Sequence, residues 1–237
     1  MKPSRPLPAG FAKEYRLHEQ LKLHYASDAD RIEVEVEGCI VDVVSGDRLI
    51  EIQTASFSSL RRKLAKLLPN YRVTVVFPVP VEKWIVRLST PDRHEVRRRR
   101  SPKSGRWIEV FKHLPYVAQF LAHRHFSLEV VLTKENEFRI NDGHGSWRRG
   151  GVRTVERELI EVVGKERFAG ARSYGRVLPD ELIEPFTSRE LANALDISMS
   201  LAQKVMYSLR CAGTARVVGK RGNARLYATK ALRKRTR

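Results

Sequence analysis

The segment from residue 39 to residue 54 constrains the fold more than any other part of the chain. It contains two apolar runs, CIVDVV and RLIEIQT, joined by a Ser-Gly-Asp turn at 45–47. Runs of this composition on either side of such a turn predict an antiparallel β-hairpin. Each run carries one acid, Asp42 in the first and Glu51 nine residues later in the second. Because a buried carboxylate is costly unless it is paired or binds a cation, the hairpin is also a candidate functional site.

The segments around this hairpin predict further regular elements. Apolar residues at helical spacing predict a helix over 11–25, and the alternating RIEVEV predicts a strand over 31–36. After the hairpin, apolar positions 57, 60, 64 and 67 predict an amphipathic helix, and the apolar run 71–80 predicts a strand. The order helix, three strands, helix, strand predicts an α/β fold in which the third and fourth strands run parallel.

The spacing of apolar residues is less regular after residue 80. Residues 81–90 read as a further strand, 107–121 as a helix interrupted near Pro115, and 127–141 as a hairpin. The glycine-rich stretch 142–151, DGHGSWRRGG, indicates a linker or a functional loop.

These patterns divide the chain into three parts. We expect a first domain over 11–141, a connecting segment over 142–181, and a C-terminal module over 182–232. In the last part, Thr187 or Ser188 can cap a helix with Glu190 as its capping-box partner.

The C-terminal module resembles a winged helix–turn–helix domain. A short helix, a turn, a longer helix ended by Gly213 and a basic hairpin follow one another over 182–232. The resemblance implies that Leu201, Val205 and Leu209 form the buried stripe of the second helix, whose outer face reads DNA while the wing contacts its backbone. The implied contacts are Ser200, Gln203, Lys204 and Tyr207 on the helix, with Lys220, Arg221 and Arg225 on the wing. The alternative is a protein–protein adaptor whose outer polar residues are solvated.

The charge of the chain favours a polyanionic partner. The chain has 237 residues, 45 Lys+Arg against 27 Asp+Glu, and a formal net charge of +18. We expect nucleic acid, with DNA as the preferred polymer. A basic loop over 97–106 would bind the phosphate backbone through Arg97, Arg98, Arg99, Arg100, Lys103 and Arg106. Beside Trp147, Arg148 and Arg149 either contact single-stranded or junction DNA, or Trp147 packs between domains.

Other classes of protein find no support in the sequence. No apolar run is long enough to span a bilayer, and the basic N-terminus lacks the apolar stretch of a signal peptide. The two cysteines, Cys39 and Cys211, are far apart in the sequence, which favours a reducing cytoplasm and, with the charge, association with the nucleoid. No phosphate-loop or dinucleotide fingerprint occurs, so no nucleotide cofactor is expected.

The two acids of the hairpin suggest metal chemistry. With a turn near 46–47, Asp42 and Glu51 come opposite one another, and both carboxylates can project from one face of the sheet. Two carboxylates that share a site repel each other, and a hard divalent cation such as Mg²⁺ relieves that repulsion. Such a cation can orient a water and stabilise the charge that develops on a phosphodiester.

This arrangement resembles the PD-(D/E)xK nuclease superfamily, whose core has the order found here and whose motif is an Asp in the second strand and acid-x-Lys in the third. The match covers Ala12 to Val81 and implies a restriction-endonuclease-like α-β-β-β-α-β core. Asp42 and Glu51 take the acidic positions, which implies that they bind Mg²⁺ (or Mn²⁺) for hydrolysis of DNA. A helical acid is a further ligand in several members, and Glu19 is the candidate here.

The chain departs from this motif at the lysine position, which holds Gln53. A glutamine can orient the attacking water but cannot stabilise negative charge as a lysine does. Some families move this lysine to the following helix, where Lys63 is available; Lys22, one turn after Glu19, is a second candidate. The string from Glu51 to Pro80, followed by the arginine run, also looks like a family of uncharacterised bacterial proteins with this nuclease-like domain.

Three functions follow from these observations. The first is a Mg²⁺-dependent endonuclease docked on DNA by a winged helix. The second is a non-catalytic DNA-binding regulator built on a decayed nuclease fold, which Gln53 favours. The third is an RNA-binding or RNA-processing factor, because basic loops do not distinguish the two polymers. The sequence leaves open whether the protein forms a homodimer.

Overall fold

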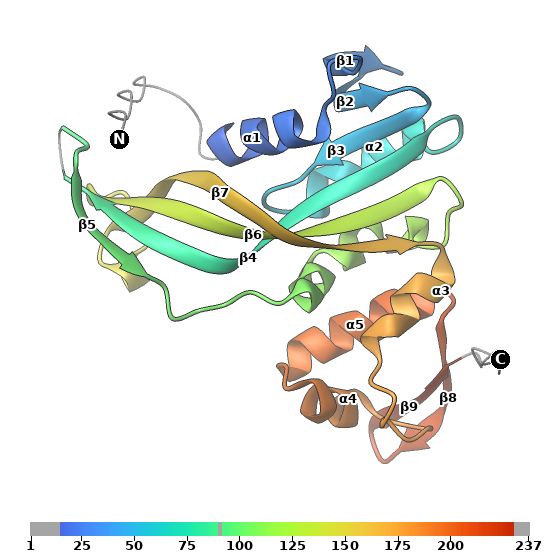
Figure 1. Ribbon diagram of the computed structural model, residues 1–237. Coiled ribbons are helices and arrows are strands. Elements are labelled where there is room, and N and C mark those ends of the chain that lie inside the picture. The colour runs from blue at the N-terminus through green and yellow to red at the C-terminus, as the bar shows by residue number, and fades with distance from the viewer. Residues whose placement is uncertain (1–14, 90–91, 230–237) are drawn as a thin grey trace.

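The computed structural model describes residues 15–89 and 92–229, which form a mixed sheet with helices on both faces and a smaller helical module at one end (Figure 1). The predicted α/β class is therefore confirmed. The sheet has seven strands in the order β1-β2-β3-β4-β6-β7, with β5 paired to β4. Its first part follows the predicted order: α1 (Tyr15–Tyr25), β1 (Arg31–Val36), β2 (Cys39–Ser45), β3 (Arg48–Ile52), the 3₁₀ turn η1 (Phe57–Ser59), α2 (Leu60–Leu67) and β4 (Arg72–Leu88).

The strand pairing in this part also agrees with the sequence. Strands β1, β2 and β3 are antiparallel neighbours, and β3 pairs parallel with β4. Residues 11–14, where we expected the first helix to begin, lie outside the described residues.

The two helices cover opposite faces of the sheet because strand side chains alternate (Figure 1). Ile50 and Ile52 of β3 pack with Leu17 and Leu21 of α1 in one apolar cluster. Leu49, one position away, belongs to a second cluster with the three buried leucines of α2, which are Leu60, Leu64 and Leu67. The spacing of these leucines is the helical period that the sequence predicts. The hairpin thus lies between two apolar layers.

Strand β4 is longer than expected, because the runs 71–80 and 81–90 form one strand that ends at Leu88. It contains Pro78 and Pro80, which lack the N–H that a central strand needs. The strand tolerates them because the backbone polar groups of successive residues point to opposite sides. The nitrogens of both prolines point to the side of β4 that has no strand partner between the end of β3 and the start of β5. The carbonyl of Pro80 accepts there from Gly105 N at 2.8 Å.

The arginine run is a strand and not a loop. Residues 95–100 form β5 (Glu95–Arg100), which pairs antiparallel with the end of β4 and is exposed along its length. Only the part after residue 100 is a loop. The helix expected over 107–121 is instead two 3₁₀ segments, η2 (Trp107–Lys112) and η3 (Leu114–Phe120), with Pro115 near the start of the second.

The hairpin expected inside 127–141 is a single strand, β6 (Phe126–Asn141). The polar run Lys134–Glu137 resembles a turn in sequence. In the structure Glu135 and Glu137 are buried, and each is paired with cationic side chains that make its burial tolerable.

The connecting segment expected over 142–181 contains an integral strand of the sheet. Strand β7 (Val152–Ala169) pairs antiparallel with the whole length of β6, and the glycine-rich stretch 142–151 is the connection of this long hairpin, with the turn η4 (Trp147–Arg149). The sequence did not predict this strand because its many charged residues obscure the apolar pattern of a strand. They lie on an edge strand, half-buried and paired with neighbours.

The C-terminal module follows β7 (Figure 1). It comprises α3 (Ala171–Tyr174), η5 (Gly175–Val177), α4 (Ser188–Leu195), α5 (Met199–Cys211), β8 (Ala215–Arg221) and β9 (Ala224–Thr229). The predicted capping box is present, with Thr187 as N-cap and Glu190 as its partner. The predicted stripe Leu201, Val205 and Leu209 is buried in the same apolar cluster as residues of η2 and η3, so the module shares its core with the sheet domain.

Within the described ranges, no helix is both long enough and apolar enough to cross a membrane.

Candidate functional site

The two acids of the hairpin lie where β2 and β3 separate. The pairing of these strands begins at the turn and stops at Val43 and Ile50, so Asp42 and Glu51 are the first residues beyond it. The Oδ2 atom of Asp42 accepts from the backbone N–H of Ile52 at 2.7 Å, in place of a ladder bond from β2. The separation of the strands therefore leaves both carboxylates at the edge of the apolar layers, with 9% and 6% of their residue surface exposed.

Asp42 also contacts His18, which the sequence analysis does not single out. His18 of α1 places Nε2 3.3 Å from Asp42 Oδ2. The hydrogen bond to Asp42 raises the pKa of His18, although burial opposes it. The sequence offers only a weak signal for His18, namely its position next to the buried Leu17 on a helix that precedes the hairpin.

Glu51 is contacted from the other face of the sheet, so the two carboxylates do not meet their partners on one face, as the sequence suggested. The Lys63 ammonium of α2 pairs with Glu51 Oε2 and also donates to the carbonyl of Ile40. Gln53 Nε2 lies 3.4 Å from Glu51 Oε1, a weak hydrogen bond. The structure thus places Lys63, and not Lys22, beside the second acid.

The protonation of Glu51 is strongly perturbed. Burial raises the pKa of Glu51 to about 7, the nearby charge of Asp42 adds to this, and the Lys63 ammonium acts against it. Near neutral pH Glu51 is therefore divided between its protonated and its ionised form. A group that supplies positive charge next to Glu51 would favour its ionised form.

Glu19 does not join these two acids. It is half-exposed and pairs with the ammonium of Lys22, which is almost completely buried and also contacts Glu33 at 2.6 Å. The expectation of a third carboxylate ligand from α1 is therefore not met in this arrangement. Among the described residues, no cluster of three or more His, Cys, Asp or Glu side chains has metal-binding geometry.

Two carboxylates still suit one kind of cation. Mg²⁺ is commonly held by one or two carboxylates, with water and substrate phosphate completing its shell. Asp42 and Glu51 offer hard oxygen donors of this type, and their mutual repulsion is the feature that a cation would relieve. The donor set fits Mg²⁺ or Mn²⁺ shared with a phosphate better than a metal enclosed by protein.

A buried ion pair fixes the backbone directly after the site. Glu135 of β6 is fully buried, and Arg157 of β7 donates to its Oε2 from Nε at 2.9 Å. The same guanidinium donates to the carbonyl of Thr54 at 3.0 Å. Because Thr54 follows Gln53, the β6–β7 hairpin holds the segment that carries the third position of the motif.

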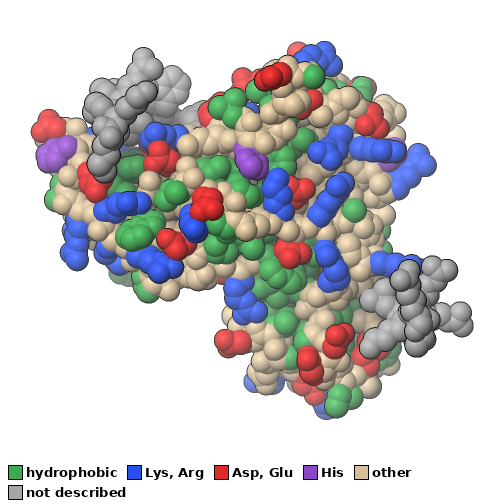
Figure 2. Space-filling view, viewed as in Figure 1, with side chains coloured by type: hydrophobic (Ala, Val, Ile, Leu, Met, Phe, Trp, Pro, Cys, Tyr) green, Lys and Arg blue, Asp and Glu red, His purple; other side chains and the backbone are tan. Residues whose placement is uncertain are grey.

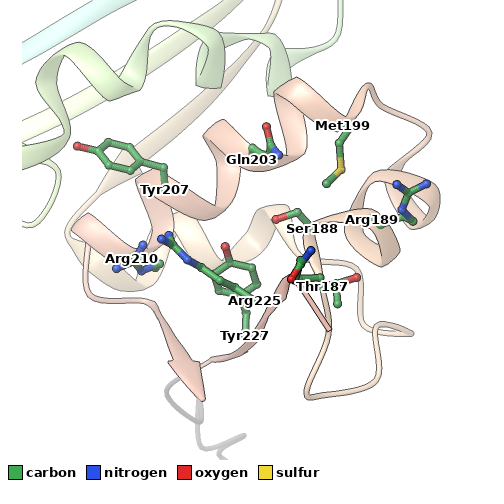
Figure 3. Close-up of a pocket in the computed structure, with 11 residues that line it drawn as sticks. Thr187, Ser188, Arg189, Met199, Gln203, Tyr207, Arg210, Arg225 and Tyr227 are labelled. Atoms are coloured by element: carbon green, nitrogen blue, oxygen red, sulfur yellow. The ribbon is translucent and has the colours of Figure 1, made fainter. Parts of the chain in front are cut away.

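A second candidate region lies between α5 and the C-terminal hairpin (Figure 3). A groove of about 540 Å³ is lined on one side by Gln203 and Tyr207 of α5 and on the other by Arg225 of β9. Arg189 and Arg210, which sequence reasoning missed, add two cations to its lining. Three of the residues expected at a DNA surface therefore meet in one groove.

The other residues expected on this module are placed differently. Ser200 and Lys220 are exposed but do not line the groove. Lys204 is half-buried near His113, whose pKa is lowered first by burial and then by neighbouring cations that include Lys204. Arg221 pairs with Glu190 at 2.8 Å.

The basic residues of the sheet domain that the sequence analysis singled out lie at three places. Arg106 donates to the carbonyl of Asp196 at 3.2 Å and so links the loop after β5 to the end of α4. Trp147 is 84% exposed at the tip of the β6–β7 hairpin, with the Arg148 guanidinium 5.5 Å from its ring centre, so it does not pack between domains. The side chain of Arg149 lies outside what the structure describes. The residues Arg97, Arg98, Arg99, Arg100 and Lys103 lie on β5 or directly after it.

Comparisons with known proteins define the relatives of the chain. Residues 15–169, from the start of α1 to the end of β7, match the family described as "Domain of unknown function (DUF8091)". A protein of Treponema pallidum (strain Nichols), described as "Uncharacterized protein", is 33% identical over 219 residues, which cover 91% of this chain and 85% of the relative. No solved structure matches the chain significantly.

Proposed function

Since the chain belongs to the family described as a domain of unknown function (DUF8091), we propose a function from its geometry: metal-dependent hydrolysis of phosphodiester bonds in DNA. The observation that carries the proposal is the meeting of Asp42, Glu51 and Lys63 where β2 and β3 separate. Two acids and one cation within a basic protein are the parts that phosphodiester hydrolysis requires. The α1-β1-β2-β3-α2-β4 order, which resembles the PD-(D/E)xK core, supports the same proposal.

Each residue then has a distinct role. Asp42 and Glu51 hold the divalent ion through their carboxylate oxygens, and His18 and the Ile52 N–H fix the orientation of Asp42. The bound ion supplies Lewis-acid stabilisation of the developing phosphate charge and an acidified water.

Lys63 and Gln53 complete the site. The ammonium of Lys63 stabilises negative charge near the scissile phosphate, the role that a lysine at position 53 would otherwise have. The amide of Gln53 orients the attacking water. The groove between α5 and β9 positions the duplex, as the resemblance to a winged helix–turn–helix implies.

The test is cleavage of supercoiled plasmid and branched DNA with Mg²⁺ or Mn²⁺ by the parent protein, D42A and E51A. We expect cleavage by the parent and none by the two variants, while DNA binding is retained. Asp47→Ala is the matched control, because Asp47 lies in the turn of the same hairpin with a side chain 77% exposed. Cleavage by D42A at the parent rate would overturn the assignment.

Two observations favour a second function, a DNA-binding regulator without catalysis. Lys63 already neutralises Glu51 in the structure, and Gln53 replaces the lysine of the motif. This alternative predicts tight binding that depends on salt but not on a divalent ion. Competition between duplex DNA, junction DNA and structured RNA in the same binding assay separates both from an RNA-processing factor.

A further inference from the structure

Strand β5 divides the arginine run between the two faces of the sheet, because successive side chains of a strand point in opposite directions. Arg98 and Arg100 share one face and have protein partners there. The Arg98 guanidinium lies 4.6 Å from the ring centre of Trp84 and donates to Asn136 at 3.1 Å. Arg100 pairs with Glu82 at 2.7 Å. These two arginines fasten the edge strand to β4 and β6.

Arg97 and Arg99 face the other side and line a groove of about 620 Å³. The two residues pair in register with Arg87 and Ile85 of β4, which belong to the same groove. Its basic lining consists of Lys83, Arg87, Arg97, Arg99, Lys103 and Arg139, and among the described residues no acidic or aromatic side chain lines it. Three of these six cations, Lys83, Arg87 and Arg139, were not singled out by the sequence.

Most of this positive charge is not neutralised by the protein. Lys83 and Arg139 share Glu137, whose own burial would raise its pKa, but these two contacts outweigh burial and lower the pKa to about 2. Within residues 15–89 and 92–229, Arg87, Arg97, Arg99 and Lys103 form no ion pair. Neighbouring cations repel each other, so the groove gains stability from a ligand with regularly spaced negative charges. Figure 2 shows Lys and Arg side chains, interspersed with acidic ones, at the end of the sheet where β5 lies.

We propose that this groove binds the phosphate backbone of duplex DNA without reading its sequence. The lining offers guanidinium and ammonium groups, which suit phosphate oxygens, and lacks the aromatic side chains on which unpaired bases stack. Trp147, the exposed aromatic of the adjoining loop, is not among the lining residues. The choice of DNA rests on the proposed function, whereas the phosphate contacts rest on the groove alone.

The groove is remote from the two carboxylates. On β4, Val75 pairs with Glu51, and Ile85 pairs with Arg99. Ten residues of strand at about 3.3 Å each span about 30 Å, close to one turn of B-form DNA. A duplex that runs along β4 therefore needs about ten base pairs beyond the carboxylates to reach the groove.

The experiment compares two variants with the same charge change on the same strand. Arg97→Ala/Arg99→Ala removes groove cations, and Arg98→Ala/Arg100→Ala removes the cations of the opposite face. Binding of a fluorescent 30-base-pair DNA is measured by anisotropy over a range of salt, in EDTA so that no cleavage is needed. Unfolding midpoints show that each variant is folded.

We expect the groove variant to reduce the slope of log K against log salt by about 2, because each phosphate contact contributes about 0.9. The opposite-face variant should change the slope by less than about 0.5.

Three results would overturn the proposal: equal slopes for the two variants, tighter parent binding of single-stranded DNA than of duplex, or equal binding of duplex RNA. Absence of cleavage by the parent protein, together with the expected difference in slope between the two variants, would refute the nuclease and leave the groove standing.

Discussion

The raised pKa of Glu51 predicts how the stability of the folded protein depends on pH. In the folded protein the Glu51 carboxyl group keeps its proton up to a pKa of about 7, whereas its ordinary pKa is 4.5. At 1.36 kcal/mol per pH unit, the difference corresponds to about 3 kcal/mol. Because the pKa is raised on folding, this contribution is fully present below pH 4.5 and lost as the pH rises through about 7.

Glu51→Gln removes the ionisation but keeps the size of the side chain. We expect E51Q to be more stable than the parent at pH 8 by up to about 3 kcal/mol, a value that already includes the opposing effect of Lys63 on the pKa of Glu51. At pH 5 Glu51 is already protonated in the folded protein, so the two proteins should differ by less than about 1 kcal/mol. Asp47→Asn is the control, because it removes the same charge from an exposed position.

The measurement is urea unfolding of the three proteins at pH 5 and pH 8, in EDTA. Parallel pH profiles for the parent and E51Q, or a less stable E51Q at pH 8, would refute the electrostatic reasoning. A second series with Mg²⁺ at pH 8 should stabilise the parent and not E51Q, since a ligand stabilises the form that binds it. Equal stabilisation of both would refute Glu51 as a metal ligand and leave the pKa argument intact.

Two further predictions concern the support of the site. Arg157→Met leaves the fully buried Glu135 without its cationic partner and should lower the free energy of unfolding in urea by about 3–5 kcal/mol. The double variant Arg157→Met/Glu135→Leu should recover most of this stability. A double variant as unstable as the single one would contradict the prediction. A Cβ at Gly105 would lie 2.7 Å from the Pro80 carbonyl oxygen, so Gly105→Ala should lower the free energy of unfolding by about 1–3 kcal/mol. Gly164→Ala, whose Cβ would have contacts of 3.5 Å or more, should leave the stability unchanged. Equal effects of the two substitutions would show that the loop at Gly105 shifts freely.

The sequence predicted the first half of the sheet because local and tertiary preferences agree there. The alternating strand 31–36, the turn at 45–47 and the leucine stripe of α2 each specify one element through contacts near in sequence. The same holds for the capping box at Thr187. Asp42, Glu51 and Lys63 could be selected as a site because they interrupt apolar patterns or border one.

The second half of the sheet could not be predicted in the same way. Strands β6 and β7 carry Glu135 and Arg157 in positions that sequence patterns assign to turns and surfaces. Each residue is acceptable inside the sheet only because the other one neutralises it from 22 positions away. Such pairs are visible only after the strands are aligned.

The sequence by itself therefore determined the hairpin, the helices that cover it and the excess of positive charge. Only the tertiary structure decided that His18 and not Glu19 reaches Asp42, and which arginines remain unpaired. The reason is physical: helix and strand periods are fixed by nearest neighbours along the chain, whereas the partner of a charged side chain depends on strand register and helix position. In the run RRRR, all four residues look equivalent in sequence, whereas in β5 Arg98 and Arg100 contact neighbouring strands and Arg97 and Arg99 form no ion pair with the described residues.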